Sequence, residues 1–154
     1  MSRRATTQRG IGRTEALIGG GAVLAVGLVA IVIGGRMFGN GAARDEVPAL
    51  VNSIRQFELD YYGPFQEYVS AESAPRALHE LNGNGVSWLS NSGFDKLGWA
   101  PENTDGVVGS YRVAATATGF TVTGSCDLDE DGERAVSVAT EKEEAKAISD
   151  PGVY

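Results

Sequence analysis

The stretch Ile11–Gly35, IGRTEALIGGGAVLAVGLVAIVIGG, decides how the rest of the chain is interpreted. From Ala16 to Gly35 it carries no charge and consists of Ala, Val, Leu, Ile and Gly alone. At a rise of about 1.5 Å per residue, a helix of roughly 20 such residues crosses the ~30 Å hydrocarbon core of a bilayer. The sequence therefore predicts a transmembrane helix over residues 11–36.

Charge is distributed unevenly around this segment. Residues 1–36 carry five Arg and one Glu, a net charge of +4, and the remainder carries eight basic and 19 acidic residues, a net −11; the two sum to the −7 of the whole chain. Because basic flanks stay in the cytoplasm, we expect a cytoplasmic N-terminus and an acidic domain outside. That acidity argues against a nucleic-acid partner, since phosphates bind basic surfaces.

Two features adjoin the start of the apolar run. Arg9-Gly10 precedes it, and Glu15 is the fifth residue counted from Ile11. A carboxylate costs about 2.5–3.5 kcal/mol at the centre of a bilayer and less near its rim. Two interpretations follow. Either Glu15 is the last cytoplasmic polar residue, or cleavage after Gly10 frees an α-amine on Ile11 of a neighbouring copy, which then pairs with Glu15.

The order of a basic leader (residues 1–10, MSRRATTQRG), an apolar helix and an acid five residues after the cut resembles the type IV pilin and pseudopilin family. The run Phe57–Ala71 is similar to the end of the long helix of many pilins, and Phe94–Thr140 to their connecting loop and strands. The resemblance implies that prepilin peptidase cleaves between Gly10 and Ile11 and methylates the new amine, and that Glu15 guides assembly.

The implied function is that of a structural subunit. The resemblance points to a type IV pilus-like filament or a type II secretion pseudopilus, built from copies of this chain or with other pilins. Before assembly the subunit would reside in the bacterial inner membrane, and afterwards in a cell-surface pilus or a periplasmic pseudopilus. An ATPase elsewhere would drive the assembly.

Two other classes of protein fit the same segment. A single-pass membrane-anchored protein would keep its leader and expose an acidic extracytoplasmic domain. A secreted binding protein would be cut near Ala42 or Ala43, beyond the apolar run, as ordinary signal peptides are. The run is long for a signal core of about 7–15 residues, which ranks secretion behind the filament subunit.

A second helical pattern follows a Gly-rich joint at residues 37–44. It begins at Asp45 and ends at Gly63-Pro64, signals typical of helix termini. Spacings of three and four predict one buried face, formed by Val47, Leu50, Val51, Ile54, Phe57 and Tyr61. Glu58 is the polar exception in this row, and we expect it to face water with Asn52, Arg55, Gln56 and Asp60.

The C-terminal half alternates between apolar and polar residues over 111–117, 120–126 and 135–139. Such alternation predicts three half-buried strands of an antiparallel meander, with Cys126 a small buried residue. Residues 64–109 read as irregular, with a short helix over 73–81. The predicted fold class is α+β: an N-terminal transmembrane or spine helix on a small three- to four-stranded antiparallel sheet, with a pilin-like globular domain over 45–154.

The turn before the last predicted strand reads DLDEDGER. Asp127, Asp129, Asp131 and the following Gly match the first half of a calcium-binding loop. The twelfth position is Val138 instead of a bidentate Glu, so the turn is no EF-hand. A weak Ca²⁺ site and a solvated acidic turn are the two interpretations.

The sequence predicts no enzyme. It contains one His and one Cys, no phosphate-binding loop and no zinc-ligand spacing. We therefore expect no catalytic residues, and no cofactor beyond the Ca²⁺ of the acidic turn.

Overall fold

The computed structural model describes residues 40–153, with side chains from residue 45 onward. The predicted leader and transmembrane helix lie outside the described residues, and with them Gly10, Ile11 and Glu15. Residues Arg36–Tyr154 form one compact unit. Within the described part of the chain, no helix is long and apolar enough to cross a membrane.

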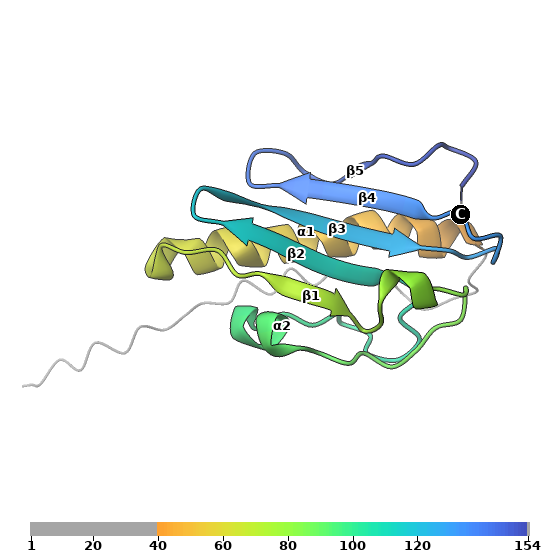
Figure 1. The fold of residues 1–154 in the computed structure, drawn as a ribbon, viewed down its shortest axis with the longest axis horizontal. Coiled ribbons are helices and arrows are strands. Elements are labelled where there is room, and N and C mark those ends of the chain that lie inside the picture. Colours follow the sequence, from red (N-terminus) through yellow and green to blue (C-terminus); the bar gives the residue numbers. More distant parts are fainter. Residues whose placement is uncertain (1–39, 154) are drawn as a thin grey trace, which may run out of the picture. The chain divides into compact units, whose positions relative to one another are not determined.

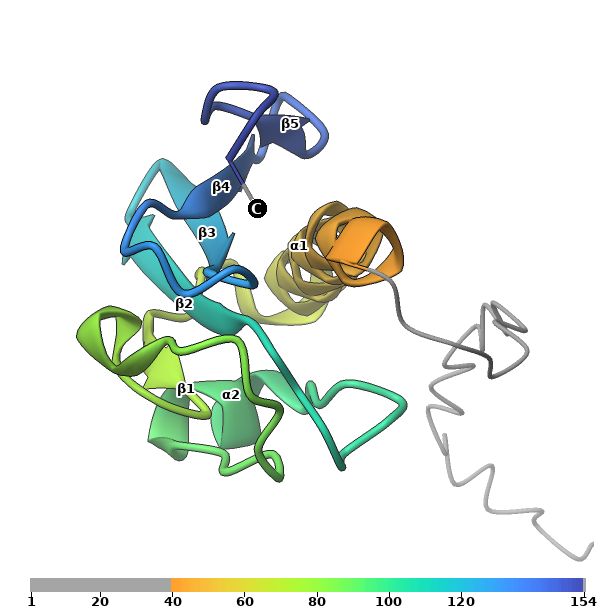
Figure 2. The ribbon, with the colours of Figure 1, turned by 90° about the vertical axis from the view of Figure 1, so that its right-hand side faces the viewer.

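The described residues form one long helix, two short ones and one sheet (Figure 1). In order, the elements are α1 (Asn40–Phe65), β1 (Ala71–Ala74), the 3₁₀ helix η1 (Leu78–Glu80), α2 (Ser92–Leu97), β2 (Ser110–Thr116), β3 (Gly119–Cys126), β4 (Ala135–Thr140) and β5 (Lys146–Ala147). The five strands are antiparallel and lie in the order β1-β2-β3-β4-β5. Helix α1 packs on one face of this sheet, against β3 and β4 (Figure 2).

This architecture corrects the predicted fold class. The sheet has five strands instead of three or four, and the domain that the structure describes is mostly β, with no membrane-spanning helix. The two additional strands lie at the edges. β1 reads AESA and β5 has only two, exposed residues, so neither is long enough to show the alternation from which strands are predicted.

The three central strands match their predicted positions. Val113 pairs with Val122, and Val122 pairs with Ala139, and all three side chains are buried on the face that receives α1. Thr116 pairs with Gly119, which closes the tight turn between β2 and β3. Period-two alternation therefore predicted the strands, but in β4 the small residues Ala135, Ser137 and Ala139 are buried, while Val136 and Val138 are only half-buried.

Helix α1 approaches β3 closely at a glycine. Val47 and Val51 are buried, one turn apart, and a Cβ atom on Gly124 would lie 2.9 Å from Val47 Cγ1 and 2.5 Å from Val51 Cγ2. Ile54 extends the same buried stripe by one more turn. The absence of a side chain at Gly124 thus sets the distance between helix and sheet.

The connection between β1 and β2 contributes aromatic side chains to the core. Asn91 caps α2, because its side-chain oxygen accepts hydrogen bonds from two N–H groups of the first turn. Phe94, Leu97 and Trp99 are buried. The indole Nε1 of Trp99 donates a 3.0 Å hydrogen bond to Ser53 Oγ of α1, which ties this connection to the helix.

Candidate functional site

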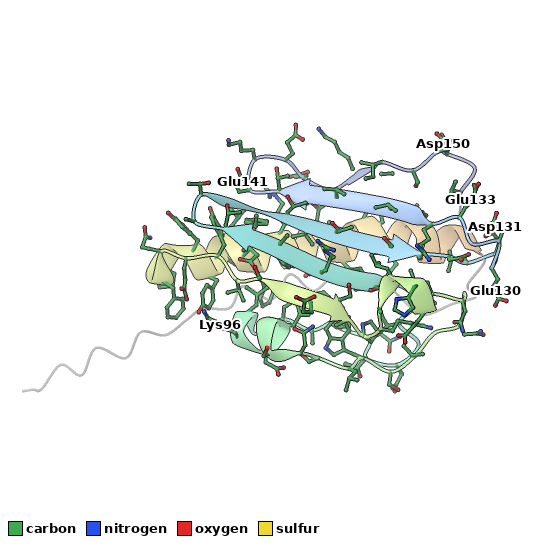
Figure 3. All side chains as sticks on the ribbon, viewed as in Figure 1. Lys96, Glu130, Asp131, Glu133, Glu141 and Asp150 are labelled. Carbon is green, nitrogen blue, oxygen red and sulfur yellow. The ribbon has the colours of Figure 1, made fainter. Side chains whose placement is uncertain are left out.

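The acidic turn, residues 127–134, connects β3 to β4 at the end of the domain where α1 begins (Figure 1). Its eight residues include five acids and one base, a net charge of −4. Figure 3 labels three of these acids, Glu130, Asp131 and Glu133, gathered at that end. The acidic turn therefore concentrates negative charge at one end of the β3–β4 hairpin.

Local backbone conformation folds the acidic turn back on itself. Glu130 has φ of 60° and Gly132 has φ of 87°, both in the left-handed region. Asp131 Oδ1 accepts a hydrogen bond of 2.7 Å from the backbone N–H of Glu133. This backbone conformation brings the side chains of Asp127, Asp129 and Asp131 to the same side of the turn.

The three aspartates meet in space. One carboxylate oxygen from each of Asp127, Asp129 and Asp131 lies within 4.8 Å of the others. Within the part of the chain that the structure describes, no other group of three or more His, Cys, Asp or Glu side chains is arranged in this way. The structure thus places these three residues close together; that they bind a metal ion stays a prediction.

The members of the cluster differ in burial. Asp129 and Asp131 are exposed, but Asp127 is only 4% exposed, and its Oδ1 has no hydrogen-bond partner among the described residues. None of the three forms an ion pair within residues 45–153. Carboxylate oxygens gathered without a base are suited to a hard cation, which takes oxygen ligands.

A second loop packs against the acidic turn. A Cβ atom on Gly83 would lie 3.1 Å from the carbonyl oxygen of Leu128 and 3.3 Å from that of Asp127. Arg76 holds this loop, because its guanidinium donates to Asn82 Oδ1 at 3.0 Å and to the carbonyl oxygen of Asn84. The acidic turn is thus supported from the side by a loop that is itself fixed.

Glu58 is a buried acid that the sequence prediction placed in water. It lies on α1 with no exposed surface, its Oε2 accepts a 3.0 Å hydrogen bond from the N–H of Val69, and its Oε1 has no partner among the described residues. Burial raises the pKa of Glu58 to about 7, although the Val69 N–H and the charge of Lys96 act in the opposite direction.

The position of Glu58 could have been found from spacing. It lies four residues after Ile54 and seven after Val51, on the stripe that meets the sheet. The polarity of Glu58 predicts that it faces water. That prediction is wrong, and the helical spacing alone would have placed Glu58 on the buried face.

The one histidine and the one cysteine of the chain lie in different elements. His79 is exposed in η1, and Cys126 is buried in β3. Comparison of the chain with family models, with curated proteins and with solved structures gives no match.

Proposed function

We propose that the chain is a structural subunit of a type IV pilus-like filament or of a type II secretion pseudopilus. Its leader is cleaved between Gly10 and Ile11, and the apolar segment 11–36 then mediates assembly. The N-terminal sequence supports this function: a basic leader that ends in Gly10, an Ile11 whose amine cleavage would free, and a carboxylate at Glu15, directly before the uncharged apolar run.

The observation that carries the proposal is that the domain has a core of its own. Residues Arg36–Tyr154 form a compact unit, and the buried cluster of the described residues is drawn from α1, α2 and the strands. The sequence also contains an apolar run of 20 residues, Ala16–Gly35, and exposing such a run to water would cost about 25 cal/mol for each Å² of apolar surface. Lipid, or the same segment of other copies, would bury it.

Assembly would use two opposite charges near the N-terminus of the mature chain, the α-amine of Ile11 and the carboxylate of Glu15. In the bilayer, the α-amine of Ile11 in one subunit pairs with Glu15 of its neighbour, because each ion is costly to desolvate alone. The paired segments then leave the membrane together and pack side by side. Six glycines at 19–21, 27, 34 and 35 favour close approach of such helices.

The domain would stay outside the filament core. Only three residues, 37–39, separate the apolar segment from α1, and α1 is packed on β3 and β4 along its buried stripe. A force on the segment would therefore reach the sheet through a helix that belongs to the domain core. The subunit itself would catalyse no reaction; its partners would be prepilin peptidase, the inner membrane and other pilins.

The N-terminus of the mature protein distinguishes the three classes of function. A chain that starts at methylated Ile11 supports the filament subunit. An uncleaved chain that retains residues 1–10 indicates a membrane-anchored protein, and a start near Ala43 indicates a secreted one; both outcomes contradict the proposal.

A further inference from the structure

We propose that the acidic turn is a calcium site, in which carboxylate oxygens of Asp127, Asp129 and Asp131 bind one Ca²⁺ ion. This inference goes beyond the filament function and does not depend on it, since it concerns only the domain that the structure describes.

The burial of Asp127 is what sets this turn apart from an ordinary acidic loop. An exposed acid needs no partner, because water solvates it. Asp127 is 4% exposed, its Oδ1 is inaccessible and has no hydrogen-bond partner in the described residues, and its carboxylate faces those of the other two aspartates within 4.8 Å. A buried carboxylate without a partner is costly, and a cation at this point would compensate it.

No side chain in the described domain supplies that positive charge. The ion pairs among the described residues are made by Lys96, Lys142 and Lys146, each with a glutamate outside the acidic turn. The one base of the turn, Arg134, is exposed and makes no ion pair in the described residues. A water molecule could accept or donate a hydrogen bond there, but it would leave three like charges together.

The donor set favours calcium over other divalent ions. All three donors are carboxylates, which suit a hard cation, and none is the thiolate or imidazole that zinc prefers. Ca²⁺ accepts six to eight oxygens in flexible geometry, whereas Mg²⁺ requires a near-ideal octahedron and gives up water reluctantly. Because Val138 lies in β4 where an EF-hand has its bidentate Glu, we expect weak binding, with Kd of about 0.1–1 mM.

Calcium would stiffen the end of the domain where α1 begins. The acidic turn joins β3 to β4, and its backbone at Asp127 and Leu128 packs against the loop at Gly83. Without the ion, repulsion within the cluster favours opening of the turn. With it, the packing of the turn against the loop is stabilised, so that the free energy of unfolding of the whole domain rises with calcium concentration.

The test uses the full chain in detergent micelles, titrated with CaCl₂ in a calorimeter and melted with 10 mM CaCl₂, with 10 mM MgCl₂, or with EDTA at matched ionic strength. We expect one Ca²⁺ per chain and a rise in Tm of about 5 °C with calcium, and a smaller rise with magnesium. Asp129→Asn, at an exposed position, should weaken calcium binding at least tenfold while the protein stays folded.

Asp127→Asn separates a binding role from a merely structural one. This variant removes the buried charge, so its Tm in EDTA should equal or exceed that of the unmodified protein, but its Tm should no longer respond to calcium. The matched control is Glu144→Gln, an exposed acid outside the turn, whose calcium response should be unchanged. Equal melts in calcium and EDTA, or a full calcium response in both aspartate variants, would overturn the proposal.

Discussion

The backbone N–H of Val69 donates a 3.0 Å hydrogen bond to Oε2 of Glu58, and this joins the segment before β1 to the C-terminal third of α1. The acceptor has no exposed surface. The Glu58 side chain therefore stabilises the fold as a hydrogen-bond acceptor, but ionisation of its buried carboxyl group lowers the free energy of unfolding.

Stability should fall with rising pH because of Glu58. Its pKa is about 7 in the folded protein against an ordinary value of 4.5. Between these two values the folded state binds more protons than the unfolded state, so the free energy of unfolding decreases as the pH rises. The loss is nearly complete about one pH unit above the folded pKa and amounts to about 3 kcal/mol. Urea unfolding at pH 4, 6 and 8 measures it.

Glu58→Gln isolates this contribution. The neutral amide can still accept from Val69, so the variant should match the unmodified protein at pH 4 and exceed its stability at pH 8. Glu67 and Glu141 act with the opposite sign, because their pKa values are lowered, and subtracting the variant's profile removes them. Glu72→Gln, at an exposed position, is the matched control. Parallel profiles for Glu58→Gln and the unmodified protein would refute this account.

The close approach of α1 to β3 predicts a cost for any side chain at Gly124. Gly124→Ala places a methyl group 2.5 Å from Val51 Cγ2, so α1 must shift, and we expect a loss of about 1–3 kcal/mol in the free energy of unfolding. Gly63→Ala is the control, since its Cβ meets no atom within 4 Å and Ala favours a helix. It should be neutral or stabilising by about 0.5–1 kcal/mol. A Gly124→Ala variant as stable as the control would show that helix and sheet are not packed as described.

The hydrogen bond from Trp99 to Ser53 predicts a further loss. Ser53→Ala leaves the indole N–H of Trp99, a residue only 3% exposed, without its acceptor, which costs about 1–3 kcal/mol. Ser87→Ala removes a bond of similar length to Asp105 at the surface and should cost less than 0.5 kcal/mol. Unfolding followed by tryptophan fluorescence compares the two; equal losses would contradict the assigned role of Ser53.

Hydrophobic periodicity predicted the centre of the domain and failed at its edges. The three long strands alternate between apolar and polar residues because one face of each is more buried than the other over most of its length. β1 and β5 depend on pairing with a neighbouring strand instead, and their sequences carry too few residues to show a period. The predicted helix start at Asp45 was five residues late, because Gly and Asn at 39–41 read as a break although α1 begins at Asn40.

The acidic turn was visible in the sequence, but the decisive difference among its residues was not. Asp127, Asp129 and Asp131 are chemically identical, and their spacing predicted that they would meet. That Asp127 is buried follows from its position directly after β3, where the chain leaves the core. Only tertiary structure distinguishes a buried acid from its exposed neighbours.

Assembly should depend on the carboxylate of Glu15. Glu15→Gln keeps the size of the side chain and removes the charge that would pair with the amine of Ile11, so we expect loss of filaments while the protein still inserts and is still cleaved. Glu15→Asp, which keeps the charge, should retain part of the assembly. Electron microscopy of sheared filaments, with immunoblotting of membranes for the precursor and the mature form, measures both. Normal filaments from Glu15→Gln would rule out the pairing.

The most direct test of the proposed function is the mass of the N-terminal peptide from the mature protein in its native host. The account predicts a peptide that begins at Ile11 and is heavier by one methyl group, with residues 1–10 absent. Mature protein that still carries residues 1–10, or that begins near Ala43, would contradict it.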